Sequence, residues 1–189
     1  MKDLKSALLL FFLLTVICGG LYPAVVTGVA AVVFPHQAQG SFITGANGRE
    51  IGSALIGQPF SDPKYLWPRP STTPDSAYNP AGSGGSNAGP TNPAYLQTVA
   101  YRVKSLRSAG ISGTIPAEMV QASASGLDPH ISPAAALMQV PRIARARNLS
   151  EEELQRIVAV HTENRLLGIF GESRVNVLAV NGVLDKLTP

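Results

Sequence analysis

Hydrophobic residues fill the start of the chain without interruption. No charged residue occurs between positions 7 and 34, where the sequence reads ALLLFFLLTVICGGLYPAVVTGVAAVVF. A helix needs roughly 20 apolar residues to cross the hydrocarbon core of a bilayer, and this run is longer. We therefore predict a transmembrane helix over residues 7–34, after a short N-terminal segment of residues 1–6. Gly19, Gly20 and Pro23 mark the positions at which this helix could bend.

Two kinds of cleaved signal compete with an anchor as explanations of this run. A secretory signal would use Gly28 and Ala30 as the small residues of its cleavage site, and a lipoprotein signal would end at Cys18. The lipoprotein interpretation fails because Ile17 precedes Cys18, where a small residue is needed. We favour an uncleaved anchor, because the apolar run continues to Phe34, beyond the cleavage site.

Short apolar runs separated by turn residues follow this segment. Residues 41–60 hold two such runs around the pair Asn47-Gly48, which predicts a β-hairpin. Proline, glycine, serine and asparagine then dominate residues 65–93, with a long loop over 68–92, and they exclude a persistent regular element. This segment is either a flexible linker or an ordered loop on a surface. The aromatic anchors that favour order are Tyr65, Trp67 and Tyr78.

A helical period of hydrophobic residues begins after this loop. Asn92 as N-cap and Pro93 at the first helical position predict a helix that ends at Gly110. Its apolar stripe consists of Leu96, Val99, Val103 and Leu106. The charged residues that we expect to face water are Arg102, Lys104 and Arg107.

Proline and serine mark the next helix. Ser132 as N-cap and Pro133 in the first turn predict its start, and Pro129 keeps Asp128 out of the helical conformation, which predicts a turn just before it. Because Pro141 lacks an amide hydrogen, this helix should kink or stop near Gln139.

A capping box predicts a third helix. Ser150 and Glu153 form the box, Leu149 and Leu154 form the hydrophobic staple, and the pattern continues to Gly168. The tail at 175–187 is ambiguous, and we favour a helix over a strand because Val177, Val180, Leu184 and Leu187 share one face. The fold class is therefore α+β, with a β-hairpin and three to four helices in a domain over residues 35–189.

Composition and charge refine this organisation. With 189 residues, 45% hydrophobic and 14% charged, the chain has room for one core in addition to a membrane segment. Lys2 and Lys5 precede the apolar run, whereas no charge follows it until Arg49, so the N-terminus is expected in the cytoplasm and the domain outside it. The single cysteine lies in the apolar run, so no disulfide is expected. The external part carries a net charge near +2, which is too weak for a nucleic-acid partner.

The stretch SGLDPHISPAAA, residues 125–136, concentrates the side chains that could perform chemistry. Asp128 and His130 are too few for a metal site, and His36 and His161 have no ligand spacing with them. A Gly-x-Ser-x-Gly elbow is absent, and GSGGSNAG has no lysine that would make it a phosphate loop. For His130 we favour a structural role over an interface or pH-sensitive role and over catalysis. An external enzyme and a free-standing anchored binding module remain as alternative functions.

Several blocks in order then indicate a family. ASGLDPHISPAAALMQVPRIARARNLS, IGSALIGQPF, YLWPRPS and GESRVNVLAVN, together with the N-terminal anchor, cover almost the whole chain. In these blocks the chain resembles the C-subunit family of the Kdp complex, the high-affinity potassium-transporting P-type ATPase of bacteria. It departs from the family pattern at Ala124, at Ala135 and in the loop AGSGGSNAGPTNP, which affects loop conformation rather than any charged group of the Asp128-Pro-His130 block.

The resemblance implies a non-catalytic accessory subunit in the bacterial inner membrane. Its implied partners are the ATP-hydrolysing subunit, a potassium-channel-like subunit, a small single-helix subunit and membrane lipid. The complex uses ATP, magnesium and potassium, while this chain binds no cofactor of its own. The chain also lacks the Asp-Lys-Thr-Gly-Thr sequence that a P-type pump phosphorylates. The family is described both as a catalytic chaperone that raises ATP affinity and as a stabiliser of the complex. Because the domain is expected outside the cytoplasm and therefore away from ATP, we favour the role in assembly.

The motif residues that become candidates for a structural or interface role lie in two of these blocks. They are Tyr65, Trp67, Pro68, Arg69, Ser125, Gly126, Asp128, His130, Ser132, Gln139 and Arg142. Small residues that would allow close packing against a partner helix in lipid are Gly19, Gly20, Ala24 and Gly28.

Overall fold

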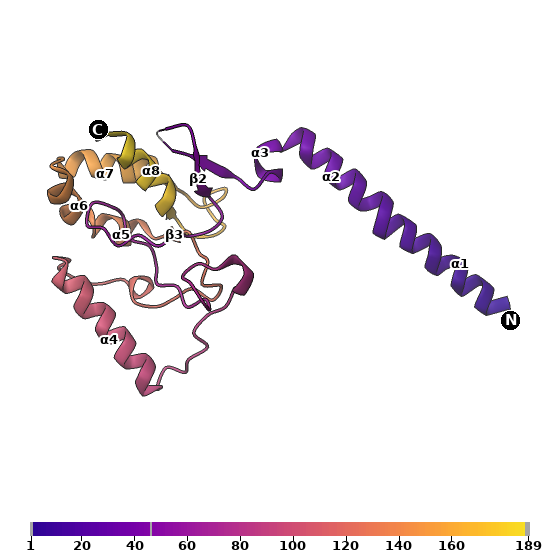
Figure 1. Ribbon diagram of the computed structural model, residues 1–189, viewed down its shortest axis with the longest axis horizontal. Coiled ribbons are helices and arrows are strands. Elements are labelled where there is room, and N and C mark those ends of the chain that lie inside the picture. The colour runs from indigo at the N-terminus through magenta and orange to yellow at the C-terminus, as the bar shows by residue number, and fades with distance from the viewer. Residues whose placement is uncertain (1, 46, 188–189) are drawn as a thin grey trace. The chain divides into compact units, whose positions relative to one another are not determined.

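The computed structural model describes residues 2–45 and 47–187 (Figure 1). The chain divides into two compact units, Met1–Phe42 and Ile43–Pro189, which we call unit 1 and unit 2. Helices and strands both occur in unit 2, which bears out the mixed fold class.

Unit 1 consists almost entirely of helix. α1 (Lys2–Val16) continues through a π-helical turn (Ile17–Leu21) into α2 (Tyr22–Val33), and α3 (Pro35–Ala38) follows. Among the described residues, one helix, Asp3–Val33, is long and apolar enough to cross a membrane, and none of it is buried. The helical conformation predicted for residues 7–34 is therefore confirmed, although the observed helix begins before residue 7 and ends at Val33.

The π-helical turn lies where the sequence predicted a bend. Pro23 has no amide hydrogen, so an α-helix would leave the Gly19 carbonyl without its donor. The helix instead contains one extra residue in this turn, and the Tyr22 amide donates to the Ile17 carbonyl five residues back. At the other end, the extended φ of −130° at Phe34 ends α2, as expected for a residue before proline.

Unit 2 begins with the predicted hairpin. β1 (Phe42–Thr44) and β2 (Glu50–Ser53) form a two-stranded sheet. The Gly45 amide donates to the Arg49 carbonyl over 2.8 Å, and Gly48 takes a φ of +76°, which glycine adopts without strain.

The long loop that follows β2 is folded onto the rest of unit 2, which favours an ordered loop over a linker. Leu66 is fully buried and Tyr78 is 7% exposed. The prediction that no regular element persists here is wrong over one turn, the 3₁₀-helix η2 (Pro80–Gly82). The Asn79 side chain caps this turn by accepting a hydrogen bond from the Ala81 amide.

Within the part of unit 2 that the structure describes, five α-helices exceed the predicted three to four. They are α4 (Pro93–Ser108), α5 (Pro133–Leu137), α6 (Val140–Arg147), α7 (Glu151–Val160) and α8 (Val177–Leu187), and a 3₁₀-turn η3 (Ala117–Met119) precedes α5. The predicted caps Asn92, Ser132 and Ser150 each accept hydrogen bonds from the first turn of their helix. The predicted break near Gln139 divides α5 from α6 and adds one helix to the count.

The predicted continuation of α7 to Gly168 is wrong. α7 ends at Val160, and the Thr162 hydroxyl donates to the Val158 carbonyl, so this side chain satisfies an acceptor at the end of the helix. The next residues form β4 (Thr162–Glu163), which pairs antiparallel with β5 (Arg174–Asn176). The segment that periodicity assigned to one helix is thus divided between a helix and a strand.

A three-stranded sheet in the order β3-β5-β4 was not predicted. β3 (His130–Ile131) pairs antiparallel with β5 and places Ile131 opposite Val175. The tail is therefore strand up to Asn176 and helix only from Val177. Strands this short carry no visible alternation, so the pairing partner decides their conformation.

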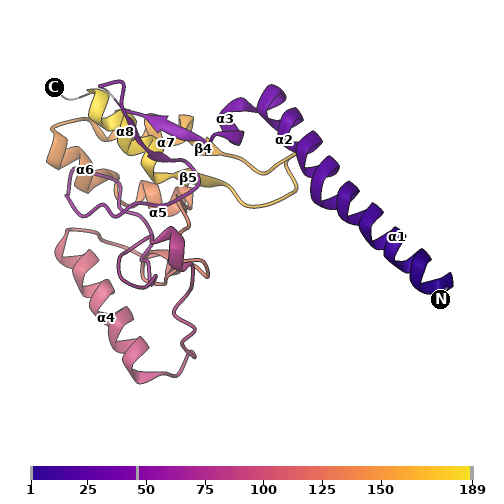
Figure 2. The same ribbon diagram turned by 45° about the vertical axis from the view of Figure 1, so that its right-hand side comes forward.

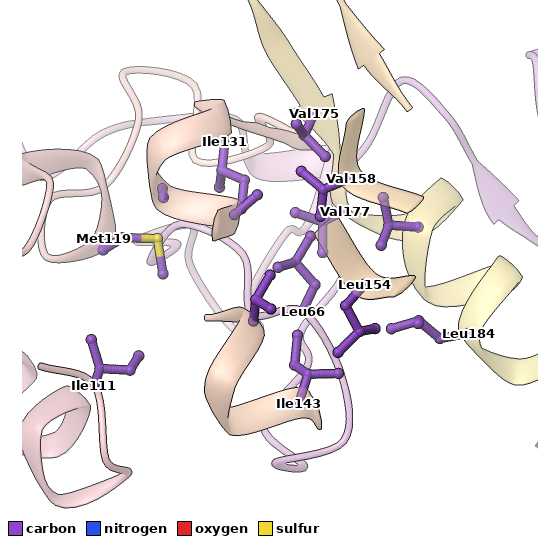
Figure 3. Close-up of a cluster of buried hydrophobic side chains, with 14 of the residues drawn as sticks. Leu66, Ile111, Met119, Ile131, Ile143, Leu154, Val158, Val175, Val177 and Leu184 are labelled. Carbon is purple, nitrogen blue, oxygen red and sulfur yellow. The ribbon is translucent and has the colours of Figure 1, made fainter. Parts of the chain in front are cut away.

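The core of unit 2 lies where the helices and the short sheet meet (Figure 3). Leu66, Ile131, Val175, Val177 and Leu184 are at most 2% exposed. They come from the long loop, from β3 and β5, and from α8, so the core joins segments that are far apart in sequence.

α4 contributes Leu106 to this core, and Val99 and Val103 pack against it. Leu106 is buried, whereas Leu96 is 50% exposed, so the predicted apolar stripe is wrong at Leu96. Arg102 does not face water fully, because its guanidinium donates to the Val120 carbonyl over 2.8 Å. α4 itself lies at the edge of unit 2 in both views (Figures 1 and 2).

Candidate functional site

Asp128 organises the turn before β3. Its Oδ1 accepts a hydrogen bond from the His130 amide over 3.0 Å, and its Oδ2 accepts one from Arg69 over 2.8 Å. The His130 Nδ1 lies 3.5 Å from Oδ1, and the His130 side chain is 21% exposed. Two candidate blocks distant in sequence, YLWPRPS and SGLDPHISP, therefore meet at one carboxylate.

The environment of Asp128 favours its charged form. Partial burial by itself raises the pKa of the carboxyl, but the side chain and amide of His130 and the charge of Arg69 outweigh this effect. The pKa of Asp128 is therefore lower than that of a free aspartate, and the group is ionised at neutral pH.

Ser132 serves as a helix cap and is engaged by a neighbour. Its Oγ accepts a hydrogen bond from the Ala135 amide over 3.2 Å, and its hydroxyl donates to Glu118 Oε1. The same carboxylate oxygen accepts the Ser132 amide over 3.1 Å. The hydroxyl proton is therefore directed to Glu118 rather than to His130.

These side chains line an open cleft with a cavity volume of about 610 Å³. Its lining includes Arg69, Glu118, Asp128, His130, Ser132 and Arg174. An acyl-transfer site would need a serine oxygen that is free to attack, whereas the Ser132 Oγ accepts the Ala135 amide as a helix cap. Within residues 2–45 and 47–187, no three His, Cys, Asp or Glu side chains are grouped so that they could hold a metal ion. The cleft is suited to binding.

A second group of candidates fixes the start of the long loop, at residues 65–67. The Trp67 amide donates to Gln139 Oε1 over 2.8 Å, and Gln139 Nε2 donates back to the Trp67 carbonyl over 3.1 Å. Arg142 lies 3.8 Å from the centre of the Trp67 ring and donates to the Tyr65 carbonyl over 3.0 Å. Burial lowers the pKa of Arg142 to about 10, so the guanidinium stays charged at neutral pH. Gln139 and Arg142 thus form a polar clamp on the backbone of residues 65–67.

Asn181 extends this clamp, although the sequence did not single it out as a candidate. Its amide accepts from Leu66 N over 2.8 Å and donates to Leu66 O over 3.0 Å. Arg147, also missed, donates to the Lys64 carbonyl and pairs with Asp185 at 3.2 Å. The signal for Asn181 was present in the sequence, because an amide among the apolar residues of a helix has to find a partner when it is buried.

Ser125 and Gly126 hold the far end of the long loop. The Ser125 carbonyl accepts the Gly84 amide over 2.8 Å, and the Gly126 carbonyl accepts the Ser71 hydroxyl over 2.8 Å. Ser71, which was not a candidate, also accepts the Tyr78 amide over 2.9 Å. Gly126 has a φ of +68°.

The remaining candidates are Pro68 and the small residues of unit 1. Pro68 lines a second, largely apolar cleft of about 350 Å³, which it shares with Trp67 and Arg69 from the two groups above. The small residues of unit 1, namely Gly19, Gly20, Ala24 and Gly28, are exposed along the long helix. A Cβ atom added at any of the three glycines would meet no atom within 4 Å.

Comparison with known proteins identifies the family. The family model described as "K+-transporting ATPase, c chain" matches residues 4–186. The KdpC subunit of the potassium-transporting ATPase from Geobacter sulfurreducens is 67% identical over 189 residues, which is 100% of both chains. The corresponding subunit from Geobacter metallireducens is 64% identical over 100% of both chains, and that from Sorangium cellulosum is 53% identical over 98% of both. A match of this extent, across both units, shows that the chain belongs to the KdpC family of K+-transporting ATPase c chains.

Proposed function

We propose that this chain is a non-catalytic accessory subunit of an ATP-driven potassium uptake complex in the cell membrane, where it stabilises the assembly of the ATP-hydrolysing and channel-like subunits. The observation that carries this proposal is the family match, which spans residues 4–186 and therefore includes both the apolar helix and unit 2. A small single-helix subunit is the third protein partner, and the complex uses ATP, magnesium and potassium.

The chemistry of the cleft supports a binding role. The Asp128 carboxylate is engaged by Arg69, and the Ser132 hydroxyl by Glu118. Buried amides and guanidinium groups are likewise used to hold backbone segments together, as with Gln139 and Trp67. Polar groups that are paired in this way give a rigid surface, which is what a scaffold for other subunits requires.

The charge asymmetry around the apolar helix supports an external position for unit 2. Lys2 and Lys5 precede the apolar run at residues 7–34, and no charged residue follows this run until Arg49. In this orientation unit 2 lies across the membrane from cytoplasmic ATP and rests over the potassium entrance of the channel-like subunit. An increase in ATP affinity, the catalytic-chaperone role, would then have to pass through the partner subunits.

Deletion of the chain tests this proposal. We expect the ATP-hydrolysing and channel-like subunits to separate during purification without it, while complexes that do assemble keep their turnover and their KM for ATP. A complex that stays intact without the chain would contradict the proposal. A chain that purifies as a stable monomer and never retains the larger subunits would instead favour a free-standing binding module.

His130→Ala separates assembly from the pump cycle. Because His130 is partly buried beside Asp128, its loss should weaken unit 2 or the complex and leave the turnover of each assembled complex nearly unchanged. Normal assembly with loss of most ATP-driven transport would show that the cleft takes part in the transport cycle, contrary to the proposal.

A further inference from the structure

A hydrogen-bonded hairpin projects between β4 and β5. The Leu166 amide donates to the Phe170 carbonyl over 2.9 Å, and the Phe170 amide donates to the Leu166 carbonyl over 3.0 Å. Gly168 at the tip has a φ of +74°, and Arg165 and Glu172 form an ion pair of 2.6 Å at the base. The backbone of this hairpin is therefore already ordered in the chain by itself.

The hairpin presents apolar side chains to solvent instead of burying them. The exposed fractions are 69% for Leu166, 81% for Leu167, 73% for Ile169 and 62% for Phe170. An aromatic side chain has roughly 150–250 Å² of surface and leucine and isoleucine somewhat less, so these four expose on the order of 400–500 Å². A contiguous apolar patch of that size marks an interaction site more often than a bare surface.

The charges beside the patch favour a protein over a membrane surface as its partner. Arg165 pairs with Glu172, and Arg174 pairs with Glu163 at 2.8 Å, so the base of the hairpin is electrically neutral. Attraction to anionic lipid headgroups needs unpaired basic residues, and insertion at the headgroup level favours tryptophan and tyrosine. The hairpin offers neither kind of residue between positions 164 and 173.

The size of the patch fits the centre of a protein interface. A stable interface buries about 800 Å² on each partner, so roughly 400–500 Å² of apolar surface would form its core, and the paired charges would form a polar rim. Interfaces concentrate their binding energy in such central, fully desolvated side chains.

We propose that the hairpin at residues 164–173 is a docking anchor whose four apolar side chains enter an apolar socket on a partner subunit of the potassium-transporting complex. This inference rests on the proposed accessory function and adds the contact surface to it. Because the backbone bonds of the hairpin are preformed, little backbone conformational entropy is lost on docking.

Photo-crosslinking in the intact complex tests the contact directly. Phe170 is replaced by the photoreactive p-benzoylphenylalanine, and the crosslinked peptides are identified by mass spectrometry. Tyr101, which is 72% exposed on α4, receives the same replacement as a control, because α4 lies away from β4 and β5 (Figure 2). We expect crosslinks from position 170 to one partner subunit at a yield about tenfold above the control. Crosslinks to lipid alone, or equal yields at both positions, would overturn the inference.

A pair of serine substitutions tests the energetic role. The double variant Leu167→Ser/Ile169→Ser should dissociate from the detergent-solubilised complex at least about tenfold faster, as expected for the loss of central apolar anchors. The matched control is Leu96→Ser/Tyr101→Ser on α4, and thermal unfolding of each full chain verifies folding. If deletion of the chain dismantles the complex while the hairpin variant dissociates like wild type, the docking inference is wrong and the accessory function stands. If deletion has no effect either, the accessory function itself fails.

Discussion

Gln139 and Asn181 act on the polypeptide backbone like an adjacent β-strand. Each amide side chain bonds to both the N–H and the C=O of one residue, Trp67 for Gln139 and Leu66 for Asn181. Both amides are at most 1% exposed. A buried segment without strand partners must satisfy its backbone groups in some other way, and these two side chains do so.

Gln139→Met should lower the free energy of unfolding by about 2–4 kcal/mol. The methionine keeps the volume but leaves the Trp67 amide, the Trp67 carbonyl and Arg142 without the bonds that Gln139 supplies. Urea unfolding of the purified chain measures the effect. The exposed Gln155 on α7 gives a control, because Gln155→Met should change stability by less than about 0.5 kcal/mol. Equal effects of both substitutions would show that the clamp is energetically unimportant.

Gly126→Ala should destabilise unit 2 by more than Gly113→Ala. Both glycines have positive φ, +68° and +77°, so the conformational strain of an alanine is similar at the two positions. An added Cβ at Gly126 would lie 2.7 Å from the Gly84 carbonyl oxygen, whereas at Gly113 it would meet no atom within 4 Å. We expect about 1 kcal/mol at Gly113 and at least about 2 kcal/mol more at Gly126, measured by thermal unfolding. A similar loss at both sites would mean that the long loop moves away freely.

Asp128 should make stability depend on pH in the acidic range. Its pKa is lower in the folded chain than in the unfolded one, so its contribution is present above about pH 4 and is lost as the pH falls through the folded-state pKa. The stability difference between wild type and Asp128→Asn should therefore be largest near neutral pH and shrink below pH 4. Urea unfolding between about pH 3 and pH 7 tests this, with the exposed Glu50→Gln as control. A constant difference across that range would refute the assignment.

At the scale of elements, the end of α7 depends on contacts with another element. α7 ends at Val160 and not at Gly168, because Thr162 and Glu163 pair with Val175 and Arg174 of β5. The caps of α4, α5 and α7, in contrast, are side chains next to their own helices, which is why the sequence predicts where these helices begin.

Gly20→Leu tests the long helix of unit 1 as a contact for a partner helix. A Cβ at Gly20 meets no atom of this chain within 4 Å, so a leucine there causes no clash within the chain itself. If small residues let a partner helix approach closely in lipid, the leucine should reduce co-purification of the partner subunits several-fold. Val29→Leu is the control, because nine residues are about two and a half turns and so place Val29 on about the opposite face of the helix from Gly20. Retention equal to wild type would mean that this face contacts lipid.

Both units have to be considered together for the orientation of the chain across the membrane. The lysines before the apolar helix predict a cytoplasmic N-terminus and an external unit 2. Because Cys18 is the single cysteine, a Cys18→Ala background allows one new thiol to be placed at a time.

Labelling with a membrane-impermeant maleimide should then distinguish the two sides. Glu152→Cys, on the exposed surface of α7, should react in cells whose outer layer is permeabilised. Asp3→Cys, at the start of α1, should react only after lysis. The reverse pattern would place unit 2 in the cytoplasm and would restore a direct contact with ATP as an explanation of the chaperone role.

The sequence by itself determined the features that depend on neighbouring residues or on composition. The apolar run, the caps Asn92, Ser132 and Ser150, the break near Gln139 and the turn at Asn47-Gly48 act over a few positions, so they are readable without a structure. The block pattern also indicated the family, which the match over residues 4–186 shows.

Only the tertiary structure decided which distant groups meet. The pairing of β3 with β5, the pairing of Arg69 with Asp128 and the clamp of Leu66 by Asn181 join residues that are at least 44 positions apart. β4 pairs with β5 over a shorter separation, but these strands are too short to show alternation. The 164–173 hairpin is similar, since Leu166 and Leu167 lie within the helix that the sequence predicts up to Gly168 and are exposed in the fold. Local sequence sets the propensity of each segment, but burial and pairing depend on which other segments complete the core, and that is a property of the whole fold.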